Sequence, residues 1–225
     1  MERAKPIRAV TLDVGGTLIE PWPSVGHVYA AAARPFGLPD IDPVALSQAF
    51  GDAWKERREF DYSRAAWRWL VDRTFAVVPG FAVSDECFDA IYDRFARAAA
   101  WRIYDDVRPF FEWARSRRVR LAVVSNWDER LPRLLEELSL SAAFEALIVS
   151  HEVGHHKPAR EIFLQAAGRL GLPPEEILHV GDSESEDFAG ARLAGLRSCW
   201  LCRTSTVAGP IGAIRSLADV PMASN

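Results

Sequence analysis

The stretch TLDVGGTLIE (residues 11–20) runs from an apolar, strand-like segment into a lone carboxylate, Asp13, and then into a glycine turn at residues 15–17. Short, nearly continuous apolar runs such as residues 7–12 are typical of strands that are buried on both faces of a parallel sheet. In that architecture ligands bind at the carboxyl ends of the strands. The stretch therefore predicts both a fold and a reacting group at residue 13.

Further apolar runs of strand length recur along the chain, and segments of helix length lie between the later ones. Short buried strands that alternate with helices are typical of a parallel sheet covered by helices on both faces. We therefore expect an α/β fold built on a doubly wound parallel sheet. The expected strands are 7–12, 119–125, 144–150, 177–181 and 198–202, and the expected helices among them are about 128–138, 159–170 and 184–194.

Residues 20–103 contain four helical patterns and no convincing strand. An interval of about eighty residues is too long for one crossover connection. We therefore expect a helical cap domain inserted at residues 20–103, and an α/β core domain made of residues 1–19 and 104–225. Helix breakers punctuate the interval at Pro39, Pro43, Pro79 and Gly80.

The composition is that of an ordinary globular protein. Of the 225 residues 49% are hydrophobic, and 27 basic and 31 acidic residues are interleaved, with a formal net charge of −4. The chain has no basic face for nucleic acid, and no apolar run reaches the ~18 residues of a membrane span. Residues 1–9 lack the apolar core of an export signal, and three cysteines without a disulfide framework are typical of a reducing compartment. We expect a cytoplasmic monomer or homodimer with neither a nucleic-acid nor a membrane partner.

Chemically useful side chains stand at or just beyond the carboxyl ends of four different predicted strands. Parallel strands bring these ends to one edge of the sheet, where this architecture gathers its active-site groups. Taken singly, each residue is most often a turn, a helix cap or a solvated surface group. Taken together and in order, they form a constellation: Asp13, Ser125 with Asn126, Lys157, and Asp182 with Asp187.

This ordered set resembles the haloacid dehalogenase-like (HAD) hydrolase superfamily, in the branch with a helical cap between the first two motifs. The family's first motif, D-x-D-G-T after a strand, is similar to residues 13–17, and its second, a Ser or Thr that ends a strand, to Ser125. Its third, a Lys before Pro and a helix, is similar to Lys157, and its fourth, G-D-x-x-x-x-D, to residues 181–187. The resemblance covers nearly the whole chain and implies a Rossmann-like core.

The resemblance implies a phosphatase that acts on a small phosphorylated metabolite through an aspartyl-phosphate intermediate, with Asp13 as the nucleophile. It also implies Mg²⁺, which takes oxygen ligands and screens the repulsion between carboxylate and phosphate. Lys157 and Ser125 would then stabilise the transferring phosphoryl group. The implied Mg²⁺ site comprises Asp13, the Gly15 carbonyl, Asp182 and Asp187, with Asp187 orienting metal-bound water or pairing with Lys157. The implied substrate contacts are Gly16, Thr17 and Asn126, with the amide hydrogens of Gly15 and Gly16 turned toward the phosphate.

Gly15 is the departure from the family's first motif, because phosphatases of the family carry a second Asp there as general acid and base. Catalysis of this kind is typically worth ~10²–10⁴ in rate. Three interpretations stay open: a phosphatase that is slow or restricted to good leaving groups such as acyl or aryl phosphates, a site with a substitute acid, or a phosphate-binding protein without turnover. The candidates for a substitute acid are His155, His156 and Asp128.

Two other branches of the family also lack the second Asp and stay as alternatives. Haloacid dehalogenases use no metal, whereas the complete motif at residues 181–187 favours one. Phosphonatases form a Schiff base on a cap lysine, and the single lysine of the expected cap is Lys55, among charged neighbours. Five of the eight tryptophans also lie in that interval, where they are expected mainly as core anchors, while Trp127 is expected near the site.

Overall fold

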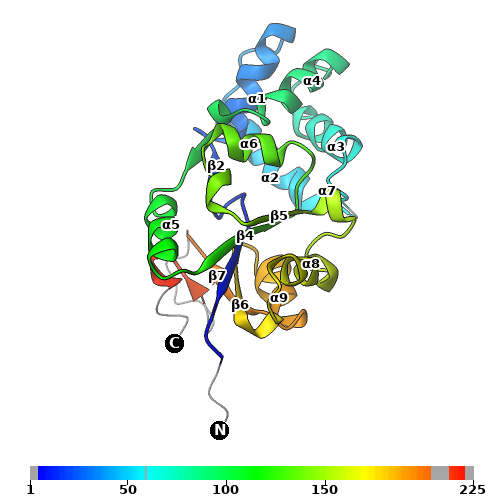
Figure 1. Cartoon of the computed structure of the whole chain (residues 1–225). Helices are drawn as coiled ribbons and strands as arrows, with labels where there is room; N and C mark the ends of the chain where they lie inside the picture. Colours follow the sequence, from blue (N-terminus) through cyan, green and yellow to red (C-terminus); the bar gives the residue numbers. More distant parts are fainter. Residues whose placement is uncertain (1–4, 59, 204–212, 221–225) are drawn as a thin grey trace. The chain divides into compact units, whose positions relative to one another are not determined.

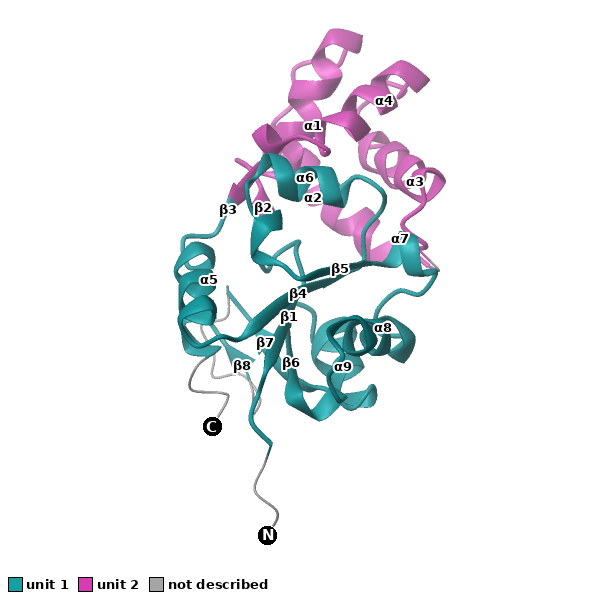
Figure 2. Cartoon of the chain, in the orientation of Figure 1, with its two compact units in different colours: residues 1–19, 103–225 teal, residues 20–102 magenta. Residues whose placement is uncertain are grey.

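The computed structural model of the chain describes residues 5–58, 60–203 and 213–220. The chain divides into two compact units, one formed by residues 1–19 with 103–225 and the other by residues 20–102 (Figure 2). Each unit has a hydrophobic core of its own. The two units are therefore described separately.

The first unit is built on a six-stranded sheet. Its strands are β1 (Ala9–Leu12), β4 (Arg120–Ser125), β5 (Ala146–Val149), β6 (Ile177–Gly181), β7 (Arg197–Leu201) and β8 (Ala213–Ile214). Their order in the sheet is β5-β4-β1-β6-β7-β8, and all neighbours pair in parallel (Figure 1). The strand order therefore switches direction at β1, and the predicted doubly wound parallel sheet is confirmed.

Helices cover both faces of this sheet. Helices α8 (Arg160–Leu170) and α9 (Gly190–Leu193) lie on one side of the sheet and α5 (Val107–Ser116) on the other (Figure 2). On the first side Phe163 of α8 packs in one cluster with Ala122 and Ile148 of the sheet. Burial on both sides explains why the strands are nearly continuous apolar runs in the sequence. The remaining helices of this unit, among the described residues, are α6 (Leu131–Glu137) and the single turn α7 (Ser150–Val153).

The predicted helix at residues 184–194 is interrupted. The structure has a π-helical turn at Glu184–Ala189 that continues into α9. In this wider turn the Asp187 carboxylate folds back, and its Oδ2 accepts the N–H of Ser183 at 2.9 Å. Single π-helical turns are frequent at functional sites, and here the turn aims Asp187 at its partners.

The second unit is helical, as the sequence predicts. Its described helices are α1 (Val25–Ala33), α2 (Pro43–Glu56), α3 (Arg64–Phe75) and α4 (Asp85–Arg94). Each begins after a residue whose side chain accepts a backbone N–H of the first turn: Ser24, Asp42, Ser63 and Ser84. The short strands β2 (Ile19–Pro21) and β3 (Trp101–Ile103) pair at the ends of the interval, where no strand was expected. Three-residue strands are too short to show a period in the sequence.

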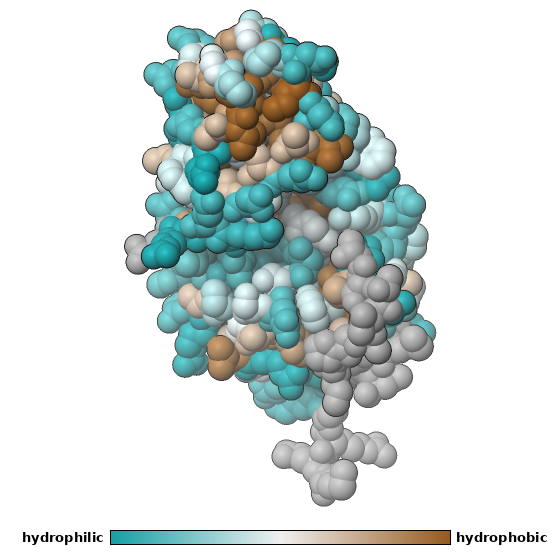
Figure 3. Space-filling model, turned by 180° about the vertical axis from the view of Figure 1, so that it is seen from behind, coloured by the Kyte–Doolittle hydropathy of each residue, from teal (hydrophilic) through white to brown (hydrophobic). Residues whose placement is uncertain are grey.

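Aromatic side chains form much of the core of the second unit. Tyr29 stacks on Phe75 with ring centroids 5.7 Å apart, and Trp54 stacks on Trp67 at 6.1 Å. These tryptophans therefore anchor the unit, whereas Trp22 is 45% exposed. Figure 3 shows hydrophobic residues gathered on the part of the surface that this unit forms.

No helix in the described part of the chain is long and apolar enough to cross a membrane. All three thiols are free: those of Cys87, Cys199 and Cys202. Burial in β7 raises the pKa of the Cys199 thiol to about 11, which makes it unreactive at neutral pH.

Candidate active site

Asp13 is the first residue after β1 and is 6% exposed. Its N–H donates to the carbonyl of Val180 in β6 at 3.0 Å, which fixes the start of the loop. Ser125, the last residue of β4, donates its hydroxyl to Asp13 Oδ1 at 2.9 Å. The Lys157 ammonium donates to the same oxygen at 2.6 Å. The sheet thus brings together the predicted nucleophile and its two predicted partners.

The Lys157 ammonium lies between two carboxylates, 2.6 Å from Asp13 and 2.5 Å from Asp187. Lys157 is only 2% exposed. Burial alone would lower the pKa of this amine, but the charges of Asp13 and Asp187 outweigh it and hold the pKa well above its usual range. The site therefore contains a permanent positive charge beside Asp13.

Asn126 holds the backbone of Lys157 with two hydrogen bonds. Its Oδ1 accepts the N–H of Lys157 at 2.7 Å, and its Nδ2 donates to the Lys157 carbonyl at 3.0 Å. The same Nδ2 lies 3.1 Å from Glu186 Oε2. The structure therefore shows Asn126 as a residue that positions Lys157, and its predicted contact with substrate stays a prediction.

His179, which the sequence analysis did not single out, lies behind Asp187 in β6 and is fully buried. Its Nε2 is 3.0 Å from Asp187 Oδ1, and its Nδ1 is 2.9 Å from Thr11 Oγ1. Burial lowers the pKa of the imidazole, although Asp187 opposes this. A neutral imidazole has one N–H, and Asp187 is an acceptor, so Nε2–H donates to Asp187 and Nδ1 accepts the Thr11 hydroxyl. A lone polar residue in the buried strand ILHVG is the signal that could have revealed it.

Both oxygens of Asp187 are engaged by the protein. Oδ1 accepts from Lys157 and His179, and Oδ2 from the N–H of Ser183. Burial would raise the pKa of this carboxyl, but the Lys157 charge and the His179 hydrogen bond hold it well below its usual range. Of the two roles expected for Asp187, pairing with Lys157 is the one that the structure displays.

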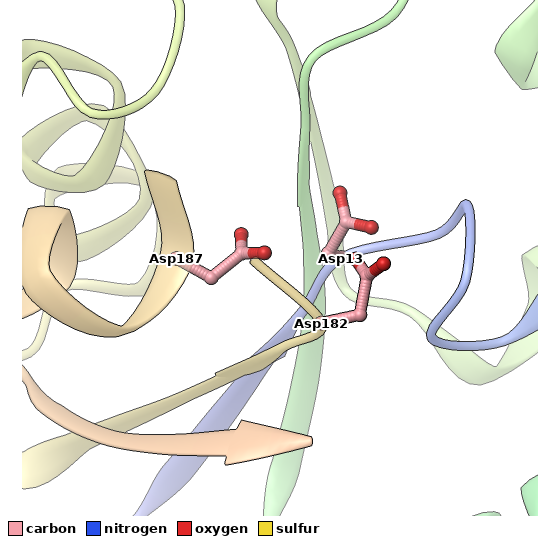
Figure 4. Close-up of side chains that lie close together, drawn as sticks. All are labelled: Asp13, Asp182 and Asp187. Atoms are coloured by element: carbon pink, nitrogen blue, oxygen red, sulfur yellow. The ribbon is translucent and has the colours of Figure 1, made fainter. Parts of the chain in front are cut away.

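Three carboxylates lie close together: Asp13 directly after β1, Asp182 directly after β6, and Asp187 on the π-helical turn that follows (Figure 4). One oxygen from each lies within 4.8 Å of the others. Asp182 is open to solvent, yet surrounding protein atoms, together with the charges of Asp13 and Asp187, raise its pKa to about 8. Three carboxylates therefore lie near a single ammonium, that of Lys157, which leaves the site with excess negative charge. This charge and the all-oxygen donor set fit a hard divalent cation such as Mg²⁺.

Two glycines make room for these carboxylates. A Cβ on Gly16 would lie 2.3 Å from Asp182 Oδ2, and the φ of Gly16 is +76°, in the left-handed region. A Cβ on Gly181 would lie 2.1 Å from Asp187 Cγ. Glycine is therefore required at both positions by the acids that face them.

The glycine turn closes on itself. The Gly16 N–H donates to the Ile19 carbonyl at 2.8 Å, so in this structure the amide is engaged within the turn. The Thr17 carbonyl accepts from Arg203 Nη2 at 2.7 Å. Thr17 Oγ1 is buried and has no hydrogen-bond partner within the described residues. A substrate contact at either residue stays a prediction.

One of the expected substitute acids, Asp128, is excluded from that role because its carboxylate is bound by an arginine. It is fully buried, and Arg130 binds both of its oxygens, Nε to Oδ1 at 2.8 Å and Nη2 to Oδ2 at 2.6 Å. A carboxylate in such a bidentate pair is not free to donate a proton to a substrate. His155 and His156 are exposed in the loop between α7 and α8, and their role as acids stays a prediction.

Comparison with known proteins identifies the family of the chain. The haloacid dehalogenase-like hydrolase family matches residues 7–195. A curated mouse relative, haloacid dehalogenase-like hydrolase domain-containing protein 3, is 33% identical over 85% of this chain and 80% of its own length. Phosphoglycolate phosphatase of Chromobacterium violaceum is 28% identical over 85% of this chain and 83% of its own length.

Solved structures share the fold. The putative HAD-hydrolase YfnB of Bacillus subtilis, bound to magnesium, superimposes with a TM-score of 0.81 at 19% identity, over 98% of this chain and 100% of that one. The L-2-haloacid dehalogenase of Xanthobacter autotrophicus has a TM-score of 0.76 at 18% identity, over 96% of this chain and 97% of that one. The fold therefore does not separate phosphatases from dehalogenases, but the family is common to all: the chain belongs to the haloacid dehalogenase-like hydrolases.

Proposed function

We propose that this hydrolase is a Mg²⁺-dependent phosphatase that acts on a small phosphorylated metabolite through an aspartyl-phosphate on Asp13. The observation that carries the proposal is the arrangement around that carboxylate. Ser125 and Lys157 donate to one of its oxygens, and two further acids lie beside it. The similarity to phosphoglycolate phosphatase supports the reaction class.

In the first step an oxygen of Asp13 attacks phosphorus, and the bond from phosphorus to the leaving oxygen breaks. In the second, water attacks phosphorus, the bond to Asp13 breaks, and inorganic phosphate leaves. The Lys157 ammonium offsets the negative charge that gathers when a phosphate meets a carboxylate. Ser125 Oγ–H, which donates to Asp13 in the structure, is near enough to turn to a phosphoryl oxygen.

The residues that we propose to hold Mg²⁺ are Asp13, Asp182 and the Gly15 carbonyl, with Asp187 as the counter-charge that keeps Lys157 in place. When bound, the ion would neutralise phosphate charge and orient the phosphoryl group. The excess negative charge of the three acids supports this assignment. The magnesium described for the Bacillus subtilis relative supports it as well.

A dehalogenase is the weaker alternative, because a cluster of three carboxylates with oxygens within 4.8 Å of one another suits a cation, which a reaction without a metal does not use. A phosphonatase is weaker still. Its Schiff base needs a sheltered, deprotonated amine, whereas the Lys55 side chain is 79% exposed and lies 3.2 Å from Asp52. A phosphate-binding protein without turnover has no need of a buried carboxylate to which both Ser125 and Lys157 donate, as they do to Asp13.

Further parts of the proposal rest on the sequence and the family. Residues 20–103 act as a cap domain that contributes to substrate choice, and Gly16, Thr17 and Asn126 lie near the phosphate. The protein works in the cytoplasm as a monomer or homodimer, and neither nucleic acid nor membrane is its partner.

A screen of phosphate compounds with Mg²⁺ tests the function. It should include acetyl phosphate, p-nitrophenyl phosphate and phosphorylated metabolites, with the release of inorganic phosphate as the readout. We expect release from at least one compound, and none from the Asp13→Asn variant at an unchanged far-UV circular dichroism spectrum. Turnover of 2-haloacids in the presence of EDTA, without any phosphate release, would replace this proposal by the dehalogenase.

A further inference from the structure

The indole of Trp127 lies where a side chain of residue 15 would begin. A Cβ built on Gly15 would be 3.3 Å from Trp127 Cζ3 and 4.0 Å from Cη2. The first distance is tighter than an ordinary carbon contact. Gly15 does not have a left-handed φ, unlike its neighbour Gly16. What opposes a side chain at residue 15 is therefore the ring of Trp127 and not the backbone conformation.

Trp127 is held in this place through its backbone. Its N–H donates to Ser150 Oγ at 3.0 Å, and the Ser150 hydroxyl donates back to the Trp127 carbonyl at 2.9 Å. The N–H of His151 donates to the same carbonyl at 3.2 Å. Ser150 is buried and directly follows β5, so this one residue fixes both the backbone N–H and the backbone carbonyl of Trp127.

The residues on either side of Trp127 are anchored as well. Asn126 is bonded to the backbone of Lys157, and Asp128 to the Arg130 guanidinium. The backbone that carries the indole is thus held by Lys157 on one side and by Ser150 on the other, and an internal ion pair stabilises the residues that follow it. The ring can yield to a new side chain at residue 15 only by rotating about its own side-chain bonds.

This contact has a chemical consequence. Position 15 is two residues after the proposed nucleophile, and neither glycine nor the carbon edge of an indole has a proton to give. When Asp13 attacks phosphorus, the leaving oxygen keeps the electron pair of the broken bond, and residue 15 supplies no proton to it, so we infer that it departs as an anion. Water then releases the phosphoryl group from Asp13 as dihydrogen phosphate, which loses a proton to solvent, so that no step needs a proton from residue 15.

We propose that Trp127 keeps position 15 free of a side chain, and that Gly15 in turn restricts the site to phosphate compounds whose leaving oxygen is a weak base, of which acyl phosphates are the metabolite class that meets this condition. The proposal rests on the phosphatase function and deepens it. Alkyl phosphates are poor substrates because their alkoxide needs a proton, which is worth ~10²–10⁴ in rate when a positioned acid supplies it.

The kinetic test uses acetyl phosphate, p-nitrophenyl phosphate, phenyl phosphate and ethyl phosphate with Mg²⁺. For the wild type we expect kcat/KM to fall steeply along this series, with ethyl phosphate at least ~10²-fold below p-nitrophenyl phosphate. Gly15→Asp alone should improve ethyl phosphate less than ~10-fold, since the indole obstructs the new acid. Gly15→Asp combined with Trp127→Ala should improve it by ~10²–10⁴. Trp127→Leu provides a second background that retains side-chain bulk without the ring.

The second test measures the contact without any turnover. Gly15→Ala adds only the Cβ, and we expect it to lower the midpoint of thermal unfolding by about 2–4 °C. In the Trp127→Ala and Trp127→Leu backgrounds this loss should largely disappear. The matched control is Gly168→Ala, at an exposed position of α8 where a Cβ would meet nothing within 4 Å. It should shift the midpoint equally in all three backgrounds.

The outcomes separate the two proposals. Similar kcat/KM values for all four compounds would keep the phosphatase and overturn the role of Trp127. An equal gain in kcat/KM for ethyl phosphate from Gly15→Asp with and without Trp127 would also overturn the role of Trp127. Additive shifts of the unfolding midpoint for the Gly15→Ala and Trp127 variants would overturn it as well. If no phosphate compound is hydrolysed although the midpoint shifts are coupled, the phosphatase itself fails, and the specificity proposal falls with it.

Discussion

His179 and Asp187 form a fully buried pair in which a neutral imidazole donates to an ionised carboxylate at 3.0 Å. We expect His179→Ala to lower the free energy of unfolding by about 2–4 kcal/mol, because it removes a hydrogen bond to a buried charge and leaves a cavity. It should also lower kcat more than it changes KM, since Asp187 positions Lys157. Denaturation in urea and steady-state kinetics measure both effects.

The matched control for His179 is His151→Ala, at an exposed position of α7, which should change neither quantity. His179→Gln retains a donor and should recover part of the loss. A kcat equal to that of the wild type in a folded His179→Ala protein would show that the hydrogen bond from His179 is not needed to position Asp187.

Asp13→Asn removes the proposed nucleophile and keeps its shape. We expect hydrolysis to be lost, while the protein stays folded because one of three crowded acids has been neutralised and Lys157 retains Asp187. Phosphate release and the thermal unfolding midpoint are the two measurements. Undiminished turnover in this variant would reject an aspartyl-phosphate on Asp13.

Mg²⁺ should bind the folded protein through the acidic cluster and stabilise it. At a concentration 100 times Kd the gain is about 2.7 kcal/mol, visible as a higher unfolding midpoint with Mg²⁺ than with EDTA. Asp182→Asn should abolish most of that shift as well as the activity. Glu184→Gln, an exposed acid two residues along, is the control and should keep both. A midpoint indifferent to Mg²⁺ in the wild type would contradict the metal site.

Asp106 contributes stability that depends on pH. Its carboxylate accepts from Arg203 at 2.9 and 3.0 Å, from the Ser216 hydroxyl at 2.7 Å and from the Leu217 N–H at 2.9 Å. Burial opposes the effect, but these hydrogen bonds hold the pKa of Asp106 below its ordinary 3.8. A carboxyl whose pKa falls on folding stabilises the protein above the unfolded value, and this contribution is lost as the pH falls below 3.8 through the folded value.

We therefore expect Asp106→Asn to lower the free energy of unfolding at pH 7 by about 1–2 kcal/mol, because three donors lose a charged acceptor at a partly exposed site. The difference from the wild type should shrink in urea titrations carried below pH 4. Asp105→Asn, at the exposed neighbouring position, should show no such difference. A gap that persists unchanged at low pH would mean that the carboxylate charge is not its source.

The sheet was predictable because its strands are buried on both faces and so stand out as apolar runs; β6 begins and ends at the predicted residues 177 and 181. Helix α5 was missed although Val107, Phe110 and Ala114 are spaced for one buried helical face, and all three are buried. The strands β2 and β3 are different, since three residues are too few to carry a pattern.

In the site, residues at strand ends could be predicted to meet because parallel strands bring those ends together, and Asp13, Ser125 and Lys157 do meet. The contact between Gly15 and Trp127 could not be predicted. It joins residues more than a hundred positions apart, and it depends on a side-chain rotamer that only packing selects. The backbone conformation of Gly15 could not be predicted either, because glycine adopts positive and negative φ with similar ease.

Four hydrogen bonds join Thr11 to His179, His179 to Asp187, Asp187 to Lys157 and Lys157 to Asp13. Thr11 lies in β1 and Asp13 directly follows that strand, so the backbone of Leu12 closes these bonds into a circuit. Each of the three middle side chains, those of His179, Asp187 and Lys157, takes part in two of these hydrogen bonds. Variants at two neighbouring members of the circuit should therefore cost less together than the sum of their separate effects, because both remove the same hydrogen bond.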